Sequence, residues 1–383
     1  MLNKRNKHMV IKRHIQKIIA SRLFKGRAVI IYGARQVGKT TLIKEIQKDY
    51  EGSSAYFSCD EPDIREALTE KTSTELKSFI GNKRLVLIDE AQRIKNIGIT
   101  LKLIIDNYPD IQVIATGSSS FDLSNQISEP LTGRKYEFQL FPFSIAELKQ
   151  VYTEIEIERL LDNRMVMGMY PDIVMKSDEA EEILRDITKS YLYKDILQFQ
   201  YIKNPDILNK LLQALALQIG NEVSYNELAG ILKIDKKTVS NYITILEKAF
   251  IIFRLNPFSR NLRNELKKLR KIYFVDTGIR NALINNLNPM KLRQDTGGLW
   301  ENFLISERIK IFSNSGKVIN FYFWRTHQQQ EIDLIEEEGS KIRGYELKQN
   351  RKSYKAPKAF LDAYPDLEVD LVNRSNYKEF LGL

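Results

Sequence analysis

Hydrophobic positions in the first 143 residues alternate between short continuous runs and stretches with helical spacing. The continuous runs predict strands at residues 28–32, 54–57, 85–88, 112–115 and 137–141. The stretches between them place apolar residues three or four positions apart and predict helices, among them 40–49 and 99–108, after an amphipathic helix within 9–25. Strands that alternate with helices in this way are typical of an α/β fold with a mainly parallel sheet.

The pattern becomes helical beyond residue 143. Helical spacing continues to about residue 206, and residues 207–256 predict several short helices followed by a strand. The last part begins with a helix at 298–312 and continues with strand patterns at 319–324, 331–336 and 342–348. We therefore expect boundaries near residues 143, 200 and 290. They divide the chain into the segments 1–143, 144–200, 201–290 and 291–383.

Composition excludes several classes of protein. With 43% hydrophobic and 28% charged residues, the 383-residue chain has ordinary globular usage, which excludes collagen, a disordered tail and a low-complexity scaffold. A single cysteine, Cys59, excludes an intrachain disulfide and a cysteine-rich zinc site. No apolar run approaches about 18 residues, and the basic N-terminus lacks the apolar core of a signal peptide. We expect a cytoplasmic protein with no membrane span.

A glycine-rich loop follows the first predicted strand and fits the pattern G-x-x-x-x-G-K-[ST]. Its glycines let successive backbone N–H groups point at phosphate oxygens, and the following helix adds a positive N-terminal dipole. Lys39 is expected to reach the β- and γ-phosphates, and the hydroxyl of Thr40 to bind Mg²⁺. The predicted ATP-binding positions are Gly33, Ala34, Arg35, Gln36, Val37, Gly38, Lys39, Thr40 and Thr41.

Two later strands end in polar residues that suit the same chemistry. The strand at 85–88 runs into Asp89, expected to hold Mg²⁺ through water, and Glu90, expected to orient or deprotonate the attacking water. An acidic strand end in solvent is the simpler alternative, but the two motifs occur in the order that this chemistry requires. The strand at 112–115 leads to Thr116 and Ser118, either of which could sense the γ-phosphate; a plain turn is the alternative.

Residues 226–275 have the spacing of a helix-turn-helix followed by a basic hairpin, which is the pattern of a winged helix. Asp235 is the expected N-cap of the second helix. The net charge of the chain, +10, is compatible with DNA as a partner but does not establish it. The side chains expected to face DNA are Lys236, Lys237, Ser240, Asn241 and Thr244, together with the hairpin residues Arg260, Arg263, Lys267, Lys268, Arg270 and Lys271. A packing module with a solvated charged face is the alternative.

Carboxylates in the last segment resemble the PD-(D/E)xK nuclease pattern. Residues i and i+2 of a strand share a face, so Glu346 and Lys348 are expected to point together at a site that Asp333 joins from the adjacent strand. Asp333 and Glu346 are the expected Mg²⁺ ligands, and Lys348 is expected to position a water or stabilise charge. Glu301 matches the additional helical acid of that fold. The alternative is a surviving fold whose chemistry is lost.

The motifs GARQVGKTTL, LIDEAQ, ATGSSS and LTGR-x₆-FPFSIAEL, in this order, resemble the AAA-type ATPases. More narrowly, they resemble the bacterial and archaeal family that pairs such an ATPase with a C-terminal DUF4143 domain. The resemblance implies an AAA-type parallel sheet with a helical lid (144–200), a winged helix (201–290) and a restriction-endonuclease-like domain (291–383).

The same resemblance assigns two further residues. It makes Arg134 a candidate arginine finger, acting within or between subunits, where a structural arginine that caps a helix or pairs with Glu137 is the alternative. In Gly168-Met-Tyr-Pro171 it places Pro171 near adenine, as in the STAND ATPases, although this sequence has one extra residue between glycine and proline.

The sequence therefore predicts an ATPase that uses ATP and Mg²⁺ and acts on DNA, with a metal-dependent nuclease domain and with a homo-oligomer left open. The alternative is a STAND-like nucleotide-dependent switch whose C-terminal part binds a protein partner. Convergence of Asp333, Glu346 and Lys348 on one site would favour the first function.

Overall fold

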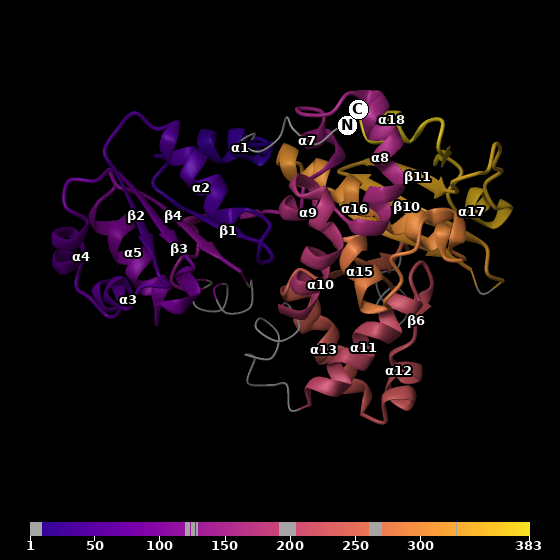
Figure 1. The fold of residues 1–383 in the computed structure, drawn as a ribbon, viewed down its shortest axis with the longest axis horizontal. Helices are drawn as coiled ribbons and strands as arrows, with labels where there is room; N and C mark the ends of the chain where they lie inside the picture. The colour runs from indigo at the N-terminus through magenta and orange to yellow at the C-terminus, as the bar shows by residue number, and fades with distance from the viewer. Residues whose placement is uncertain are drawn as a thin grey trace. The chain divides into compact units, whose positions relative to one another are not determined.

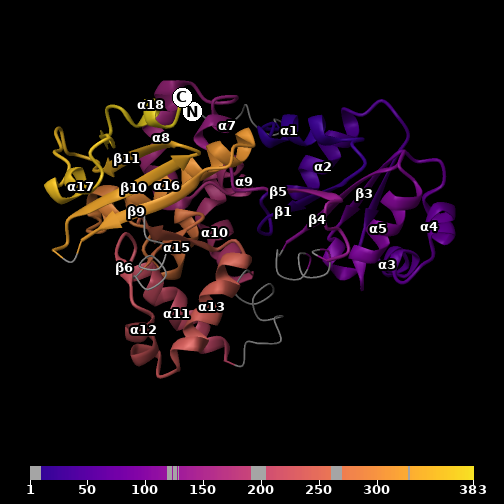
Figure 2. The same ribbon diagram turned by 180° about the vertical axis from the view of Figure 1, so that it is seen from behind.

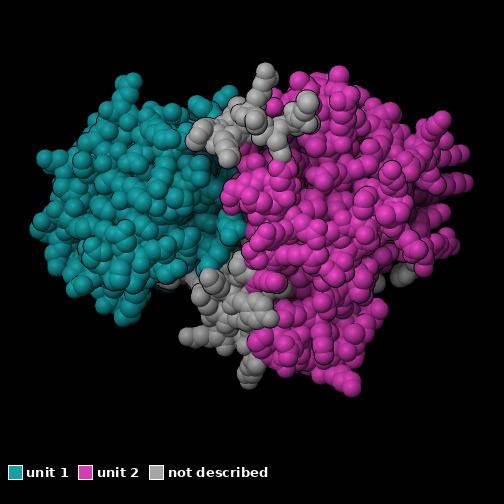
Figure 3. Space-filling view, in the orientation of Figure 1, with its two compact units in different colours: residues 1–143, 248–250 teal, residues 144–247, 251–383 magenta. Residues whose placement is uncertain are grey.

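The computed structural model describes residues 10–118, 123, 127, 129–190, 204–259, 270–326 and 328–383. The chain divides into two compact units, coloured separately in Figure 3. Unit 1 comprises Met1–Phe143 and Lys248–Phe250, and unit 2 comprises Ser144–Glu247 and Ile251–Leu383. Among the described residues, no helix has both the length and the apolar character needed to cross a membrane.

Unit 1 is built on a five-stranded sheet in the order β2-β3-β4-β1-β5, with every neighbouring pair parallel. The strands are β1 (Ala28–Tyr32), β2 (Ser54–Ser58), β3 (Leu85–Asp89), β4 (Gln112–Gly117) and β5 (Lys135–Gln139). All residues of the three inner strands are buried, whereas both edge strands are largely half-buried. This difference explains why the inner strands have continuous apolar sequences. The predicted parallel sheet is confirmed, with β5 beginning two residues earlier than expected.

Helices connect the strands of unit 1, as a parallel sheet requires. α1 (Ile15–Arg22) precedes the first strand. The described connecting elements are α2 (Lys39–Lys48), α3 (Pro62–Leu68), α4 (Ser73–Ile80), η1 (Ala91–Arg93) and α5 (Ile97–Asn107); all of these helices except η1 are labelled in Figure 1. Because β1, β3 and β4 are parallel, their carboxyl ends meet at one edge of the sheet. The glycine-rich loop, Asp89 and Thr116 therefore lie at the same edge.

Unit 2 begins with a run of helices, in agreement with the helical period beyond residue 143. Several start with a hydrogen-bonded cap; α8, for example, has a capping box between Thr153 and Glu156. The helical elements before the second sheet are α7 (Ile145–Leu148), α8 (Glu154–Met167), α9 (Pro171–Met175), η2 (Ser177–Glu179) and α10 (Ala180–Ser190). Those that follow are α11 (Pro205–Leu217), α12 (Tyr225–Leu232), α13 (Lys236–Lys248), α15 (Thr277–Leu283), η4 (Met290–Leu292), α16 (Thr296–Ser315), α17 (Lys358–Ala363) and α18 (Tyr377–Phe380).

The sheet of unit 2 has seven strands in the order β12-β11-β10-β9-β7-β8-β6. They are β6 (Glu222–Val223), β7 (Ile252–Pro257), β8 (Arg270–Phe274), β9 (Asn320–Arg325), β10 (Glu331–Glu338), β11 (Lys341–Leu347) and β12 (Val369–Val372). Figure 2 shows β9, β10 and β11 side by side, in orange to yellow. The strands predicted for the last segment are confirmed to within a few residues.

One parallel pairing, between β7 and β9, joins two parts of the chain that the sequence predicts as separate segments. Asn256 is paired with Tyr322, and Pro257 with Phe323. Through this seam the antiparallel strands β6, β8 and β7 continue into the C-terminal strands. The predicted boundary near residue 290 therefore does not separate two compact units, because one sheet crosses it. The finer division into lid, winged helix and C-terminal domain stays a prediction.

A short turn joins α12 to α13, and the helix-turn-helix assignment stays a prediction. Lys233 adopts a left-handed conformation (φ 54°) that ends α12. A carboxylate oxygen of Asp235 then accepts the backbone N–H of Thr238 at 2.8 Å, so the predicted N-cap is confirmed. Residues 260–269, which include the predicted basic tip with Arg260, Arg263, Lys267 and Lys268, lie outside the described part of the chain.

Candidate functional site

The glycine-rich loop of unit 1 is tightly curled between β1 and α2. Gln36 and Gly38 have positive φ angles of 60° and 95°, a conformation that glycine adopts without strain. At Gly33, a Cβ atom would lie 2.4 Å from the carbonyl oxygen of Leu140, so no larger residue fits there. The loop therefore has the close backbone turns that a phosphate-binding loop requires.

The ammonium group of Lys39 lies inside this loop. Its Nζ atom donates hydrogen bonds to the carbonyl oxygens of Gly33 at 2.8 Å and Ala34 at 2.9 Å, and the side chain is only 5% exposed. An ammonium held at the start of α2 combines its charge with the positive end of the helix dipole. This combination favours phosphate binding, and the contact of Lys39 with the β- and γ-phosphates stays a prediction.

Asp89 is the centre of the polar cluster at the end of β3. Its Oδ2 atom accepts hydrogen bonds from the hydroxyls of Thr40 at 2.6 Å and Tyr56 at 2.9 Å, while Oδ1 accepts one from Thr116. Three predicted residues, Thr40, Asp89 and Thr116, thus converge. Tyr56 was not predicted. Its burial, followed by its hydrogen bond to Asp89, raises the pKa of the phenol, which therefore remains a donor.

Glu90 projects from the same strand end in a left-handed backbone conformation, with φ 55°. The side-chain amide of Gln92 donates to Oε2 of Glu90 and also to the hydroxyl of Ser118 at 3.2 Å. Gln92 therefore links the carboxylate expected to act on water with the residue expected to sense the γ-phosphate. The sequence analysis missed Gln92, although it lies within the LIDEAQ motif.

Arg13 is a second residue that the sequence analysis missed. Its guanidinium is buried and donates to the carbonyl oxygens of Val37 at 2.8 Å and Phe141 at 2.6 Å, and it lies 4.9 Å from the ring of Phe143. It thereby holds the glycine-rich loop against the segment that follows β5. In the sequence, the signal that could have indicated the burial of Arg13 is its position among apolar residues before α1.

The structure places Arg134 away from the glycine-rich loop. The carbonyl oxygen of Arg134 accepts the N–H of Ala28 at the amino end of β1, while the loop follows the carboxyl end of that strand. The guanidinium pairs with Asp106 at 2.7 Å, and the alternative partner, Glu137, pairs with Lys135 instead. This position is incompatible with contact to the loop of the same subunit. That Arg134 acts as an arginine finger on a neighbouring subunit stays a prediction.

Pro171 and Gly168 belong to unit 2, where the GMYP segment links α8 to α9. Gly168 ends α8 with φ 84°, and a Cβ atom there would lie 2.0 Å from a carboxylate oxygen of Asp276. The other oxygen of Asp276 accepts the N–H of Met169 at 2.7 Å. Packing against Asp276 therefore accounts for the glycine. The role of Pro171, the first residue of α9, beside adenine stays a prediction.

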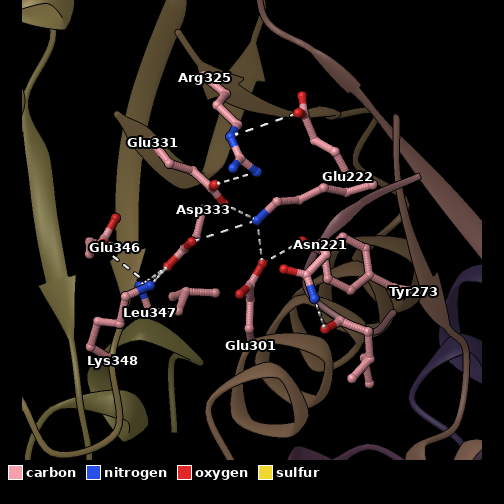
Figure 4. Close-up of polar contacts among 12 residues, drawn as sticks. Asn221, Glu222, Tyr273, Glu301, Arg325, Glu331, Asp333, Glu346, Leu347 and Lys348 are labelled. Atoms are coloured by element: carbon pink, nitrogen blue, oxygen red, sulfur yellow. Dashed lines mark hydrogen bonds and ion pairs between the residues drawn. The ribbon is translucent and has the colours of Figure 1, made fainter. Parts of the chain in front are cut away.

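The predicted residues of the C-terminal site converge in unit 2, as Figure 4 shows. Lys348 Nζ lies 2.7 Å from Asp333 Oδ2 and 3.2 Å from Glu346 Oε1. The backbone N–H of Leu347 also donates to Asp333 Oδ2, at 2.9 Å. Glu301 reaches the same cluster from α16. Because β10 and β11 pair antiparallel and residues two apart share a face, the sequence pattern was sufficient to bring these residues together.

Lys271 corrects one of the sequence predictions. Lys271 was expected to face DNA from the basic hairpin, but its side chain is fully buried at the carboxylate cluster. Its Nζ atom lies 2.8 Å from Glu301 Oε1 and 3.7 Å from Asp333 Oδ1, and it forms an ion pair with Glu331. The pairing of β7 with β9 carries β8, and with it Lys271, to this place. Sequence patterns do not reveal that pairing.

Burial, followed by the charge of Asp333, raises the pKa of Glu301 to about 7. Burial, followed by the charge of Asp333, also raises the pKa of Glu346 to about 7. For Lys271, burial alone would lower the pKa, but the summed charges of Glu301, Asp333 and Glu331, with Tyr273, hold it well above its usual value. Lys271 is therefore charged. It lies beside carboxyl groups whose charged form is disfavoured by burial.

Three segments of the chain match family models. Residues 25–149 match a family described as an AAA domain, and residues 296–378 match a domain of unknown function, DUF4143. Residues 158–290 match another domain of unknown function, DUF8612, which spans the boundary predicted near residue 200. The chain thus contains a segment similar to an AAA domain and, after it, one similar to a DUF4143 domain, in the order that the resemblance implied.

Relatives cover most of the chain at low identity. An uncharacterized protein of Methanocaldococcus jannaschii is 28% identical over 382 residues, which cover 94% of this chain and 83% of the relative. An uncharacterized protein of Mycobacterium tuberculosis is 26% identical over 330 residues, or 85% of this chain and 71% of the relative. Among solved structures, the Pif1 helicase of Candida albicans is 16% identical and covers 40% of this chain and 44% of its own. Its TM-score of 0.24 supports no conclusion about fold or activity.

Proposed function

We propose that unit 1 binds and hydrolyses ATP with Mg²⁺. The observation that carries this proposal is the convergence of Thr40 and Thr116 on Asp89, beside the glycine-rich loop that contains Lys39. The hydroxyl of Thr40 and the carboxylate of Asp89 are the oxygen ligands that Mg²⁺ prefers. Glu90 lies one residue further, where it can orient water at the γ-phosphate.

Steady-state ATPase measurements test this proposal. Lys39→Ala should abolish hydrolysis and weaken ATP binding, because the loop loses its cation. Glu90→Gln should retain ATP binding and lose turnover. Lys48→Ala, at the exposed end of the same helix, is the matched control and should behave as the wild type. Wild-type turnover in Glu90→Gln would contradict the role assigned to that carboxylate.

We further propose that the protein acts on DNA through a winged helix formed by α11–α13 and β6–β8. Lys236, Lys237 and Asn241 on α13 are exposed, and Ser240 and Thr244 on the same helix are half-buried, so this face can approach a major groove. If the lysines contact phosphates, affinity must fall steeply with salt concentration. Lys236→Ala/Lys237→Ala should reduce the slope of log K against log salt by about 2, at roughly 0.9 per phosphate contact.

The matched control for DNA binding is Lys83→Ala/Lys102→Ala, which removes two exposed lysines of unit 1. It should leave the slope unchanged. Neutralising Lys267, Lys268 and Arg270 together should flatten the slope in the same way if the hairpin contacts DNA. The rate of ATP hydrolysis with and without DNA separates this proposal from a nucleotide-dependent switch that binds a protein partner. Strong stimulation by DNA favours the former.

Phosphodiester hydrolysis at the C-terminal cluster is a second candidate activity, favoured by the convergence of Asp333, Glu346 and Lys348. The test uses Lys39→Ala protein, in which ATP is not turned over, with Mn²⁺ or Mg²⁺ and linear or branched DNA. Cleavage that disappears in Asp333→Ala and in Lys348→Ala would support it. If cleavage needs ATP, the same two variants are compared in protein that retains Lys39. Absence of cleavage under both regimes would favour the switch.

A further inference from the structure

Lys271 lies at the position in the carboxylate cluster that a divalent metal would require. One oxygen from each of Glu301, Glu331 and Asp333 lies within 4.8 Å of the others, close enough to share a single cation. The Nζ atom of Lys271 forms ion pairs with all three carboxylates, which are labelled in Figure 4. The ammonium is the cation that they share in this structure.

We propose that Lys271 is the resident cation of this cluster and that its ammonium and a divalent metal exclude one another. The proposal rests on the C-terminal site described above and adds the condition under which that site can take a metal. In the conformation shown, the residues do not fit a metal ion. Lys271 is fully buried against Glu301, Glu331 and Asp333, and Lys348 already binds the other oxygen of Asp333, Oδ2, and one oxygen of Glu346.

A second observation indicates that the cluster has unused capacity for a cation. The Oε2 atom of Glu346 is buried and has no hydrogen-bond partner of good geometry among the described residues, although the phenol of Tyr354 is near enough for Glu346 to raise its pKa. The Glu346 side chain as a whole is only 7% exposed, so water does not readily satisfy this oxygen. Because Glu346 lies beside Asp333, this oxygen is a further carboxylate ligand that a cation at the cluster could use. A divalent metal can bind this oxygen of Glu346 only if Lys271 or Lys348 withdraws from the cluster.

The fold offers a route by which Lys271 could withdraw. The strand that carries it, β8, belongs to the three-stranded group β6, β8 and β7, whose strand pairing with the described C-terminal strands runs through β7 and β9. That seam contains two residue pairs, whereas β9 and β10 are joined by five. Nη1 of Arg325 lies 3.2 Å from Glu331 Oε2, and Nε of Arg325 lies 3.7 Å from Glu222 Oε2. Arg325 can therefore retain part of the charge balance after Lys271 leaves.

Metal binding without nucleotide tests the proposal directly. The free Mn²⁺ signal in electron paramagnetic resonance is followed for the full chain as wild type, Lys271→Gln, Lys271→Arg and Lys271→Gln/Asp333→Asn. Lys271→Gln should bind one Mn²⁺ at least about tenfold more tightly than the wild type. The reason is that the ammonium of Lys271 and a divalent cation about 4 Å away repel each other, and the variant lacks this repulsion. Lys271→Arg keeps the charge and should resemble the wild type. The double variant should lose the added binding.

Loss of a buried cation leaves carboxylates uncompensated, so Lys271→Gln can fail to fold without metal. Thermal unfolding with and without Mn²⁺ covers this case. The proposal requires Mn²⁺ to raise the melting temperature of Lys271→Gln but not that of the wild type. Lys271→Gln/Glu331→Gln restores the charge balance and provides a second folded variant for the same measurement. If neither variant is stabilised by Mn²⁺ or binds it, the proposal is wrong.

The outcomes also separate this proposal from the proposed hydrolysis. A wild type that binds Mn²⁺ as tightly as Lys271→Gln, at a site lost in Asp333→Asn, would overturn the role of Lys271 and leave the hydrolysis proposal standing. Tight Mn²⁺ binding by Lys271→Gln without DNA cleavage would support Lys271 as the resident cation and count against hydrolysis.

Discussion

The hydroxyl of Thr116 donates a hydrogen bond to Oδ1 of Asp89, although the two residues belong to different strands. The same hydroxyl oxygen accepts the backbone N–H of Glu90 at 3.2 Å. One side chain of β4 therefore positions both the expected metal-binding carboxylate and the backbone of the residue expected to act on water. The ends of β3 and β4 are coupled through it.

Replacing Thr116 should slow hydrolysis more than it weakens ATP binding. Thr116→Val keeps the shape but removes the hydroxyl, and a lost hydrogen bond to a charged group costs about 1.5–3 kcal/mol. We expect a fall in kcat of about tenfold to a hundredfold, since each factor of ten corresponds to about 1.4 kcal/mol. Steady-state kinetics and fluorescent-nucleotide titration measure the two effects. Thr116→Ser is the control and should retain most activity. Equal kcat values for Thr116→Val and the wild type would contradict the role assigned to Thr116.

Gln92 should act on turnover through Glu90. Its amide donates to the Glu90 carboxylate and to Ser118, so Gln92→Ala leaves Glu90 without its orienting partner. We expect kcat to fall by about tenfold, equivalent to about 1.4 kcal/mol, with little change in the Kd for ATP. A matching loss of ATP affinity would show instead that Gln92 supports the loop rather than the carboxylate.

Arg13 should stabilise unit 1 and its phosphate-binding loop together. Two of its buried hydrogen bonds end on the carbonyl oxygens of Val37 and Phe141, and hydrogen bonds from charged groups contribute about 1.5–3 kcal/mol each. Arg13→Ala should therefore lower the free energy of unfolding by about 3 kcal/mol or more in urea denaturation and weaken ATP binding. Arg13→Lys cannot span both carbonyls and should fall between. Unchanged ATP affinity in the destabilised variant would limit Arg13 to a structural role.

The sequence predicts best those parts of each site that lie in one continuous motif. Lys39 and Thr40 follow β1 directly, and Glu346 and Lys348 share a strand face, so their positions follow from local geometry alone. Tyr56, Arg13 and Lys271 reach the sites from distant segments. For Lys271 the decisive event is the pairing of Asn256 with Tyr322, which leaves no periodic signal in the sequence. A lysine in a basic run is ordinarily solvated, and only that pairing makes it a buried counter-ion.

The pKa of Glu301 predicts a pH dependence of stability. Burial raises this pKa to about 7, whereas an unfolded glutamate titrates near 4.5. Between these values the folded protein keeps a proton that the unfolded chain has lost, so this group makes the free energy of unfolding fall as pH rises from 4.5 to 7. As pH rises from 5 to 8, the free energy of unfolding should fall less in Glu301→Gln than in the wild type. The ceiling for one proton is about 1.4 kcal/mol per pH unit.

Urea denaturation at several pH values measures this difference. Glu338→Gln, which removes an exposed carboxylate from the end of β10 in the same sheet, is the control and should follow the wild-type curve. Identical pH slopes for Glu301→Gln and wild type would mean that Glu301 is ionised throughout this range. That result would require Lys271 and Tyr273, which both donate to Glu301 Oε1, to outweigh the cost of burial.

Gly168 provides the last prediction, which tests how the GMYP segment is used. A Cβ atom at this residue would lie 2.0 Å from Asp276 Oδ1, and the positive φ of 84° disfavours any other residue. Gly168→Ala should therefore lower the free energy of unfolding by more than about 2 kcal/mol, through strain and displacement of Asp276. Gly297→Ala is the matched control, because no atom lies within 4 Å of its Cβ position and it lies in α16, where alanine favours the helix.

ATP binding by the same two variants separates packing from nucleotide recognition. If the glycine serves only the contact with Asp276, Gly168→Ala protein that remains folded should bind ATP with an affinity close to that of the wild type. If Pro171 lies beside adenine, a displaced GMYP segment should instead weaken ATP binding while leaving inorganic triphosphate binding unchanged, because triphosphate lacks the base. Equal losses for ATP and triphosphate would contradict an adenine contact, since the loop that contains Lys39 is expected to bind only the phosphates.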